Sequence, residues 1–312
     1  MAPDGAPDLL AVPLPAVPLP AVPLPARLLA ATRLVHPFPS ILDGLVVALI
    51  AIVAGGPAGI ALLLGLSMTL LQFSIGTLND LVDAPRDAGL KPGKPIPAGA
   101  VTPAAARIVA LACAGGGLAL ALVGGVGLVA VALVGLGIGA VYDLRAKGTT
   151  LSWLPLALGI PLLPVYGWYG AAGTLPGIFL VLIPAAANAG TALAIANAVV
   201  DMERDAEAGS QSIALALGPG RAALLVVVLH GVVATLAVAT TIVVGAPTGW
   251  VAAVALACLA PLGGGVLGAV AAHRPETTWR ELAWEVQAVG TGLLAVAWLG
   301  AVSASAGTSL AG

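Results

Sequence analysis

Long uncharged stretches divide the chain, and its charged residues fall in short clusters between them. A membrane-spanning helix needs about 20 apolar residues. Four of the stretches are long enough for two such helices with a glycine- or proline-rich break between them, and the last is long enough for one. The pattern predicts an all-α integral membrane protein with nine spans. The uncharged stretches are residues 44–79, 108–142, 148–200, 222–272 and 286–312.

The breaks set the ends of the predicted spans. They are Gly55-Gly56-Pro57, Gly124-Gly125, residues 170–176 and Gly245-Ala246-Pro247. The first predicted span is the shortest, and it carries an acidic residue, Asp43. The predicted spans are residues 41–54, 58–80, 103–123, 126–143, 151–171, 176–200, 221–244, 248–270 and 283–303.

The N-terminal segment differs from the rest of the chain. Residues 11–25 are three copies of Ala-Val-Pro-Leu-Pro, a repeat that favours polyproline II and cannot form a helix. We expect residues 1–30 to be a flexible Pro-rich cytoplasmic tail, with docking of a proline-binding partner as the alternative. Residues 31–312 are then expected to form a single nine-helix membrane domain.

Composition agrees with a membrane protein and excludes a soluble one. Hydrophobic residues make up 60% of the 312 residues and charged residues 8%, against roughly 25% charged in an ordinary soluble domain. The formal net charge of −2 gives no excess of Lys and Arg for binding the phosphates of nucleic acid. Nucleic acid is therefore excluded as a partner, and membrane lipid is expected to surround the chain.

Basic residues set the predicted orientation. If each pair of spans leaves and returns, all 12 Lys and Arg lie on one side of the membrane, and the opposite turns have none. The positive-inside rule then places the charged side in the cytoplasm and the C-terminus outside. We expect a multi-pass protein of the plasma membrane.

The most specific signal is a short motif that occurs twice. Residues 79–88 read Asn-Asp-Leu-Val-Asp-Ala-Pro-Arg-Asp-Ala, and residues 197–206 read Asn-Ala-Val-Val-Asp-Met-Glu-Arg-Asp-Ala. Six of the ten positions are identical, and each copy stands at the end of an even-numbered predicted span. We infer that the two halves of the chain are related and bring the copies face to face.

Both copies place an Asn and two Asp at intervals of four residues. On a helix this spacing keeps the three side chains within about 80° of one another. Five carboxylates in one pocket would repel one another without a cation, and oxygen ligands without His or Cys favour Mg²⁺, which commonly binds substrate phosphates as well. A phosphate or diphosphate is the expected ligand, and solvated helix ends are the alternative. The expected metal ligands are Asn79, Asp80, Asp83, Asp87, Asp201 and Asp205.

Cationic residues in the loops add to this site. Lys94 lies between the second and third predicted spans, and Arg145 and Lys147 lie between the fourth and fifth. They are expected to meet diphosphate oxygens, with anchoring to anionic lipid as the alternative. His36 lacks metal-ligand spacing and is given no role.

Together these residues resemble the UbiA superfamily of intramembrane prenyltransferases. The resemblance covers about residues 30–303, and Lys94 departs from the Arg that many members have before the same proline. It implies a nine-helix bundle with an apolar cavity and the two Asp-rich motifs at its cytoplasmic mouth. The matching residues are Asn79-Asp80-x-x-Asp83-x-x-x-Asp87, Lys94-Pro95, Gly99, Tyr142 with Arg145 and Lys147, and Asp201-x-x-x-Asp205.

The resemblance also implies an activity. A prenyl group is transferred, with Mg²⁺, from a (poly)prenyl diphosphate to a nucleophilic acceptor, aromatic or lipid-precursor, and pyrophosphate is released. Metal and cations would stabilise the departing diphosphate. The implied catalytic residues are Asn79, Asp83, Asp87, Asp201 and Asp205; Arg86, Lys94, Arg145 and Lys147 would steady the diphosphate, and Tyr142 would contact donor or acceptor.

Two other functions fit parts of this pattern. A terpene cyclase of the same superfamily would ionise the same donor and quench the cation within its own chain. A secondary transporter also has paired motifs in two halves, but its site usually lies near the middle of the membrane rather than at one rim.

Overall fold

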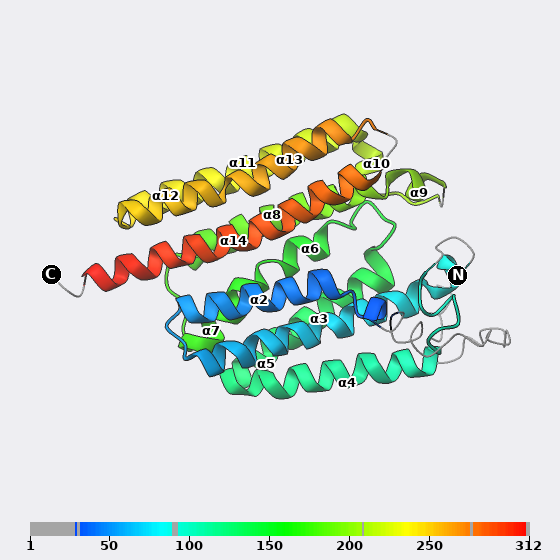
Figure 1. Cartoon of the computed structure of the whole chain (residues 1–312), viewed down its shortest axis with the longest axis horizontal. Helices are drawn as coiled ribbons and strands as arrows, with labels where there is room; N and C mark the ends of the chain where they lie inside the picture. The colour runs from blue at the N-terminus through cyan, green and yellow to red at the C-terminus, as the bar shows by residue number, and fades with distance from the viewer. Residues whose placement is uncertain (1–28, 30–31, 89–92, 208, 275–276, 310–312) are drawn as a thin grey trace, which may run out of the picture.

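All regular structure in the described part of the chain is helical (Figure 1). The computed structural model describes residues 29, 32–88, 93–207, 209–274 and 277–309, so the predicted tail lies almost entirely outside the described residues. The helices are α2 (Pro37–Val53), α3 (Ala58–Asp87), α4 (Pro103–Ala121), η1 (Leu122–Gly124), α5 (Val126–Val141), η2 (Tyr142–Ala146), α6 (Leu154–Gly159), α7 (Leu162–Ala172), α8 (Phe179–Val200), α9 (Met202–Glu207), α10 (Ile213–Leu217), α11 (Pro219–Val243), α12 (Thr248–Ala257), α13 (Leu259–Ala271) and α14 (Thr277–Ser309).

Eight helical segments of the described residues are long and apolar enough to cross a membrane. They match the second to ninth predicted spans, and they confirm an all-helical membrane protein. The helix at the first predicted span, α2, has 17 residues and is shorter than the others. That α2 forms a ninth membrane span therefore stays a prediction. The eight segments are Ala58–Asp87, Pro103–Gly124, Val126–Ala146, Leu154–Ala172, Phe179–Val200, Pro219–Val243, Thr248–Ala271 and Thr277–Ser305.

The predicted breaks are turns in the structure. Gly55, Gly125, Gly173 and Gly245 each have a positive φ, a conformation that glycine adopts without a steric cost. Two further interruptions were not predicted. The fifth predicted span is split between α6 and α7, and the eighth between α12 and α13.

Both copies of the repeated motif lie at the same end of the bundle. The C-terminal ends of α3 and α8, the short helices α9 and α10, and the start of α14 gather there, while the turns after α2, α4, α7 and α11 lie at the opposite end (Figure 1). Since the loops at this end carry the charged clusters, the arrangement agrees with the predicted separation of charged loops from uncharged turns.

Two glycines bring α2 and α3 into close contact. A Cβ added at Gly44 would lie 2.7 Å from the Gly65 carbonyl oxygen, and one added at Gly65 would lie 2.8 Å from the Gly44 carbonyl oxygen. Both distances are too short for a real Cβ. The backbones can therefore approach this closely only because both positions are glycine.

Candidate active site

The first motif lies on the last two turns of α3. This helix continues to Asp87, seven residues beyond the predicted end of the span at residue 80. Asp80, Asp83 and Asp87 are buried, with exposed fractions of 3%, 5% and 6%. The structure thus places these carboxylates inside the protein, and not on a solvated helix end.

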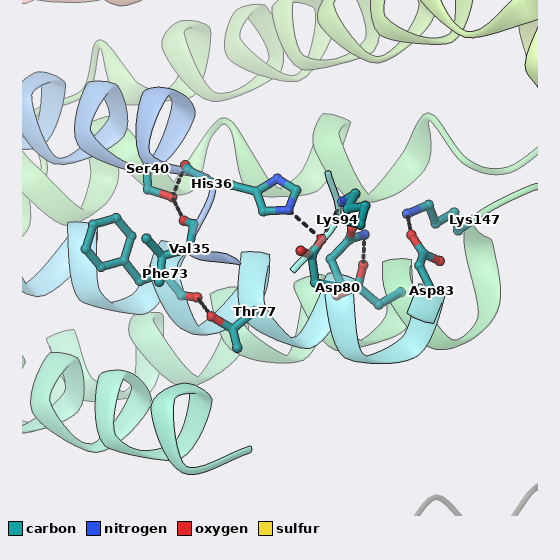
Figure 2. A network of polar contacts seen from close by, with 11 residues as sticks. Val35, His36, Ser40, Phe73, Thr77, Asp80, Asp83, Lys94 and Lys147 are labelled. Atoms are coloured by element: carbon teal, nitrogen blue, oxygen red, sulfur yellow. Dashed lines mark hydrogen bonds and ion pairs between the residues drawn. The ribbon is translucent and has the colours of Figure 1, made fainter. Parts of the chain in front are cut away.

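Asp80 is held by two side chains, those of a histidine and a lysine. His36 Nε2 lies 2.8 Å from Asp80 Oδ1, and the Lys94 ammonium donates to the same oxygen (Figure 2). The other oxygen, Asp80 Oδ2, is buried and has no hydrogen-bond partner among the described residues. His36 is not among the predicted site residues, and its place just before Pro37, the first residue of α2, is the sequence feature that puts it at this end of the helix.

The segment after α5 docks against the same motif. The Asn79 amide donates a hydrogen bond of 2.7 Å to Asp143 Oδ1, and the Lys147 ammonium donates to Asp83 Oδ2. Asp143 stands in the π-helical turn η2, beside Tyr142, and is buried. Asp143 is not among the predicted site residues; its signal in the sequence is the dense charge of residues 143–147 at the end of a span.

The spacing of the second motif predicts one unbroken helix, but the structure interrupts the helix within the motif. Asp201 is the C-cap of α8, and α9 begins at Met202. Asp201 pairs with Arg204 at 2.9 Å, and the Asp205 N–H donates to the Asp201 carbonyl oxygen at 2.8 Å. The side chains of this copy therefore depend on a helix end, whereas those of the first copy stand on a continuous helix.

Tyr142 lies near aspartates of both copies. Its neighbour Asp143 and the carboxylates of Asp83, Asp201 and Asp205 lie within electrostatic range of its hydroxyl. A backbone hydrogen bond of 2.9 Å from Gln211 N–H to the Gly148 carbonyl oxygen also joins the loops that follow η2 and α9. The structure thus brings both motifs toward one phenol. Arg86 and Arg145 are exposed and lie outside the network of Asp80, Asp83 and Asn79 with their partners.

The oxygen atoms of this region are of the kind that a hard cation prefers, although those of the described residues are not gathered into a metal cluster. Within the described ranges, no three His, Cys, Asp or Glu side chains stand close enough to hold a metal. Lys94 and Lys147 instead supply the positive charge that Asp80 and Asp83 require. Two buried carboxylate oxygens, Asp80 Oδ2 and Asp143 Oδ2, have no partner among the described residues. Because all these donors are oxygen atoms, Mg²⁺ is the ion they suit.

A mainly apolar cavity of about 310 Å³ extends from Tyr142 into the bundle. Its walls come from α2, α3, α5, α6, α7, α8, α11 and α14. The volume lies at the lower end of the range found for small-molecule sites. Its lining includes a carboxylate, Asp43, and an amide, Gln72, among predominantly apolar side chains.

A buried arginine fixes the end of α8. The Arg280 guanidinium donates to the Val199 carbonyl oxygen at 3.0 Å and to both carboxylate oxygens of Glu203 at 2.8 Å. The hydrogen bond to Arg280 holds the pKa of the Glu203 carboxyl below its usual value. Arg280 was not among the predicted site residues, although it braces the helix end that carries Asp201.

Comparisons with known proteins agree on the family and the fold. Residues 42–284 match the model of the UbiA prenyltransferase family. Digeranylgeranylglyceryl phosphate synthase of Methanopyrus kandleri is 32% identical over 149 residues, which are 46% of this chain and 52% of that protein, so the alignment spans about half the length of the relative.

Solved structures extend the likeness over most of the chain. A UbiA homologue from Archaeoglobus fulgidus bound to GPP and Mg²⁺ has a TM-score of 0.65 at 19% identity, covering 85% of this chain and 99% of that one. A structure of digeranylgeranylglyceryl phosphate synthase in membranes has a TM-score of 0.65 at 16% identity, covering 89% and 98%. At such identities the likeness shows a shared fold.

Proposed function

Since this chain belongs to the UbiA prenyltransferase family, we propose that it transfers a prenyl group from a prenyl diphosphate to a nucleophilic acceptor and releases pyrophosphate. The observation that carries the proposal is that Tyr142 lies within electrostatic range of aspartates from both acidic motifs and also lines the apolar cavity. A diphosphate headgroup suits the charged end, and a hydrocarbon chain suits the cavity below it.

The motif residues hold the diphosphate end of the donor. Mg²⁺, when bound, neutralises negative charge on the departing diphosphate. Its ligands are drawn from Asn79, Asp80, Asp83, Asp87, Asp201 and Asp205. The donor set and the binding of GPP and Mg²⁺ by the Archaeoglobus fulgidus homologue support this assignment.

Lys94 and Lys147 act both in the empty site and in the site with bound donor. In the structure Lys94 and Lys147 neutralise Asp80 and Asp83. When donor binds, the same ammonium groups donate hydrogen bonds to diphosphate oxygens, since charge-assisted bonds to phosphate are strong. Arg86 and Arg145, which are exposed at this end, reach the diphosphate from outside. The apolar walls of the cavity keep water away from the reacting carbon.

We propose that the protein lies in the plasma membrane and that the charged end of the bundle faces the cytoplasm. The one-sided distribution of Lys and Arg in the sequence supports that orientation. The name of the Methanopyrus kandleri relative makes geranylgeranylglyceryl phosphate the first acceptor to test, with aromatic acceptors as the second class.

Purified full-length protein in lipid nanodiscs tests the function. With geranyl diphosphate, Mg²⁺ and geranylgeranylglyceryl phosphate, we expect pyrophosphate release and a prenylated product, and excess chelator should stop both. Asp83→Asn and Asp201→Asn should reduce turnover by at least about 100-fold, because each removes charge that a metal needs. Glu207→Gln, an exposed carboxylate of α9, is the matched control and should retain turnover.

The same assay separates transfer from cyclisation. A terpene hydrocarbon or alcohol formed from donor alone would favour a cyclase. Full activity in chelator, or in both Asp variants, would exclude the proposed metal and diphosphate site.

A further inference from the structure

Asp43 and Gln72 form a polar pair in the wall of the otherwise mainly apolar cavity. The Gln72 amide donates a hydrogen bond of 2.5 Å to Asp43 Oδ2, joining α2 to α3. Both residues line the cavity together with Tyr142. We call these two residues the cavity pair. Neither belongs to the repeated motif or to its partners.

Gln72 of the cavity pair lies on the same side of α3 as the motif. Gln72 precedes Asn79 by seven residues and Asp83 by eleven. At 100° per residue, the three side chains lie within about 40° of one another, and Gln72 stands about 10 Å deeper along the axis than Asn79. A molecule that fills the cavity below the diphosphate therefore meets the cavity pair.

Asp43 is the only acidic or basic side chain that the described residues contribute to the cavity lining. Its one partner within the described part of the chain is the Gln72 amide, which occupies Oδ2 and leaves Oδ1 available. No lysine or arginine of the described residues lines the cavity to neutralise it. An ionisable group at such depth is costly in a membrane protein and usually has a function.

We propose that Asp43 is the acceptor-binding carboxylate of the cavity and that Gln72 is the positioning residue that orients it. The proposal rests on the proposed prenyl transfer and names its acceptor class, an amphiphilic alcohol. Asp43 Oδ1 accepts a hydrogen bond from the acceptor hydroxyl, and the alkyl part of the acceptor fills the apolar cavity.

The transfer step balances without any further reactant. The bond between C1 of the prenyl group and the diphosphate oxygen breaks, and its electron pair leaves with the diphosphate. A lone pair of the acceptor oxygen forms the new C1–O bond. The acceptor O–H bond breaks, and its proton passes to the Asp43 carboxylate. The product is an ether, and pyrophosphate is released.

Kinetics of the full-length protein in nanodiscs test this assignment. The donor is geranyl diphosphate with Mg²⁺, and the acceptor probes are geranylgeranylglyceryl phosphate and the aromatic acid 4-hydroxybenzoate. We expect the wild-type protein to prenylate the alcohol. Asp43→Asn should lower kcat/KM for that acceptor by about 100-fold or more, the usual effect of removing a general base. Equilibrium binding of radiolabelled geranyl diphosphate should be retained, which also reports a folded site.

Further variants separate binding from positioning. Asp43→Glu keeps a carboxylate and should restore part of the rate lost in Asp43→Asn. Gln72→Met should lower kcat for the alcohol without changing the KM for geranyl diphosphate. Thr235→Val, a change at an exposed α11 threonine outside the cavity lining, is the matched control and should leave both constants unchanged.

Three results would overturn the assignment. The first is that Asp43→Asn keeps the kcat/KM of the wild type for the alcohol. The second is that this variant loses donor binding. The third is that the wild-type protein prenylates only 4-hydroxybenzoate, or neither probe. The proposed function fails separately, if the wild type neither binds geranyl diphosphate nor releases pyrophosphate with Mg²⁺.

Discussion

The Asn79 side chain donates a hydrogen bond of 2.7 Å to Asp143, 64 positions away in the chain. This contact ties the first acidic motif to the turn that carries Tyr142. Asp143 is 5% exposed, and its second carboxylate oxygen is buried without a partner among the described residues. The Asn79 amide is therefore the main compensation for a buried carboxylate.

Asn79→Ala is expected to destabilise the metal-free protein by about 1–3 kcal/mol, because it leaves the Asp143 carboxylate buried and unsatisfied. The melting temperature in nanodiscs measures the effect. Asp143→Asn should relieve part of the loss in the double variant, since the uncompensated charge is gone. Strictly additive changes in the double-mutant cycle would show that the two side chains do not interact.

The pair of Lys147 with Asp83 predicts a link between stability and Mg²⁺. Lys147→Met removes the counter-charge of a carboxylate that is 5% exposed. We expect a loss of about 1–3 kcal/mol without metal, less than for a fully buried pair because Lys147 is partly accessible. Added Mg²⁺ should raise the melting temperature of this variant more than that of the wild type. Arg221→Met, at an exposed position, is the control, and equal Mg²⁺ responses in both would contradict the prediction.

Much of the architecture could be predicted from the distribution of charge. Long uncharged stretches and glycine breaks locate the helices and turns, because the cost of placing charge in lipid is large and nonspecific. The same distribution of charge predicts that both acidic motifs lie at one end of the bundle. The four-residue spacing of the first motif predicts that Asp83 and Asp87 share a helical face, which α3 confirms by continuing to Asp87.

The pairing of side chains could not be predicted in this way. His36 meets Asp80 across 44 positions, and Gln72 meets Asp43 across 29. Such contacts depend on the rotation of each helix about its axis. In soluble helices a polar face reveals that rotation, but helices that are apolar on every side give no such signal. For the same reason the sequence alone did not distinguish the cavity wall from the lipid-facing surface.

The Arg280–Glu203 pair predicts a pH dependence of stability. The folded-state pKa of Glu203 lies below its ordinary value of 4.5. Its contribution is therefore present above pH 4.5 and is lost as the pH falls through the folded-state pKa. Because the Glu203 side chain is 60% exposed, we expect only about 1 kcal/mol or less.

Glu203→Gln should accordingly melt at a lower temperature than the wild type at pH 7, and the gap should close toward pH 3.5. Glu281→Gln, at an exposed acidic position on α14, serves as the control. A constant gap across this pH range would rule out ionisation of Glu203 as the source of the difference.

The contact of Gly44 with Gly65 predicts a packing defect. A Cβ at Gly65 would lie 2.8 Å from the Gly44 carbonyl oxygen and 2.9 Å from Ala48 Cβ. Gly65→Ala should therefore push α2 and α3 apart and cost about 1–3 kcal/mol. Gly59→Ala, on the same helix with no atom within 4 Å of the added Cβ, should be neutral or slightly stabilising. Equal melting temperatures for the two variants would disprove the close approach.

The orientation of the bundle predicts the sidedness of chemical labelling. Ala88 follows α3 at the end that carries both motifs, and Thr174 lies in the turn between α7 and α8; both are exposed. In a background lacking Cys113 and Cys258, Ala88→Cys should react with an impermeant thiol reagent only from the cytoplasmic face, and Thr174→Cys only from outside. The opposite pattern would show that the bundle has the reverse orientation in the membrane. Labelling of both sites from one face would show that the two ends of the bundle do not lie on opposite sides of the membrane.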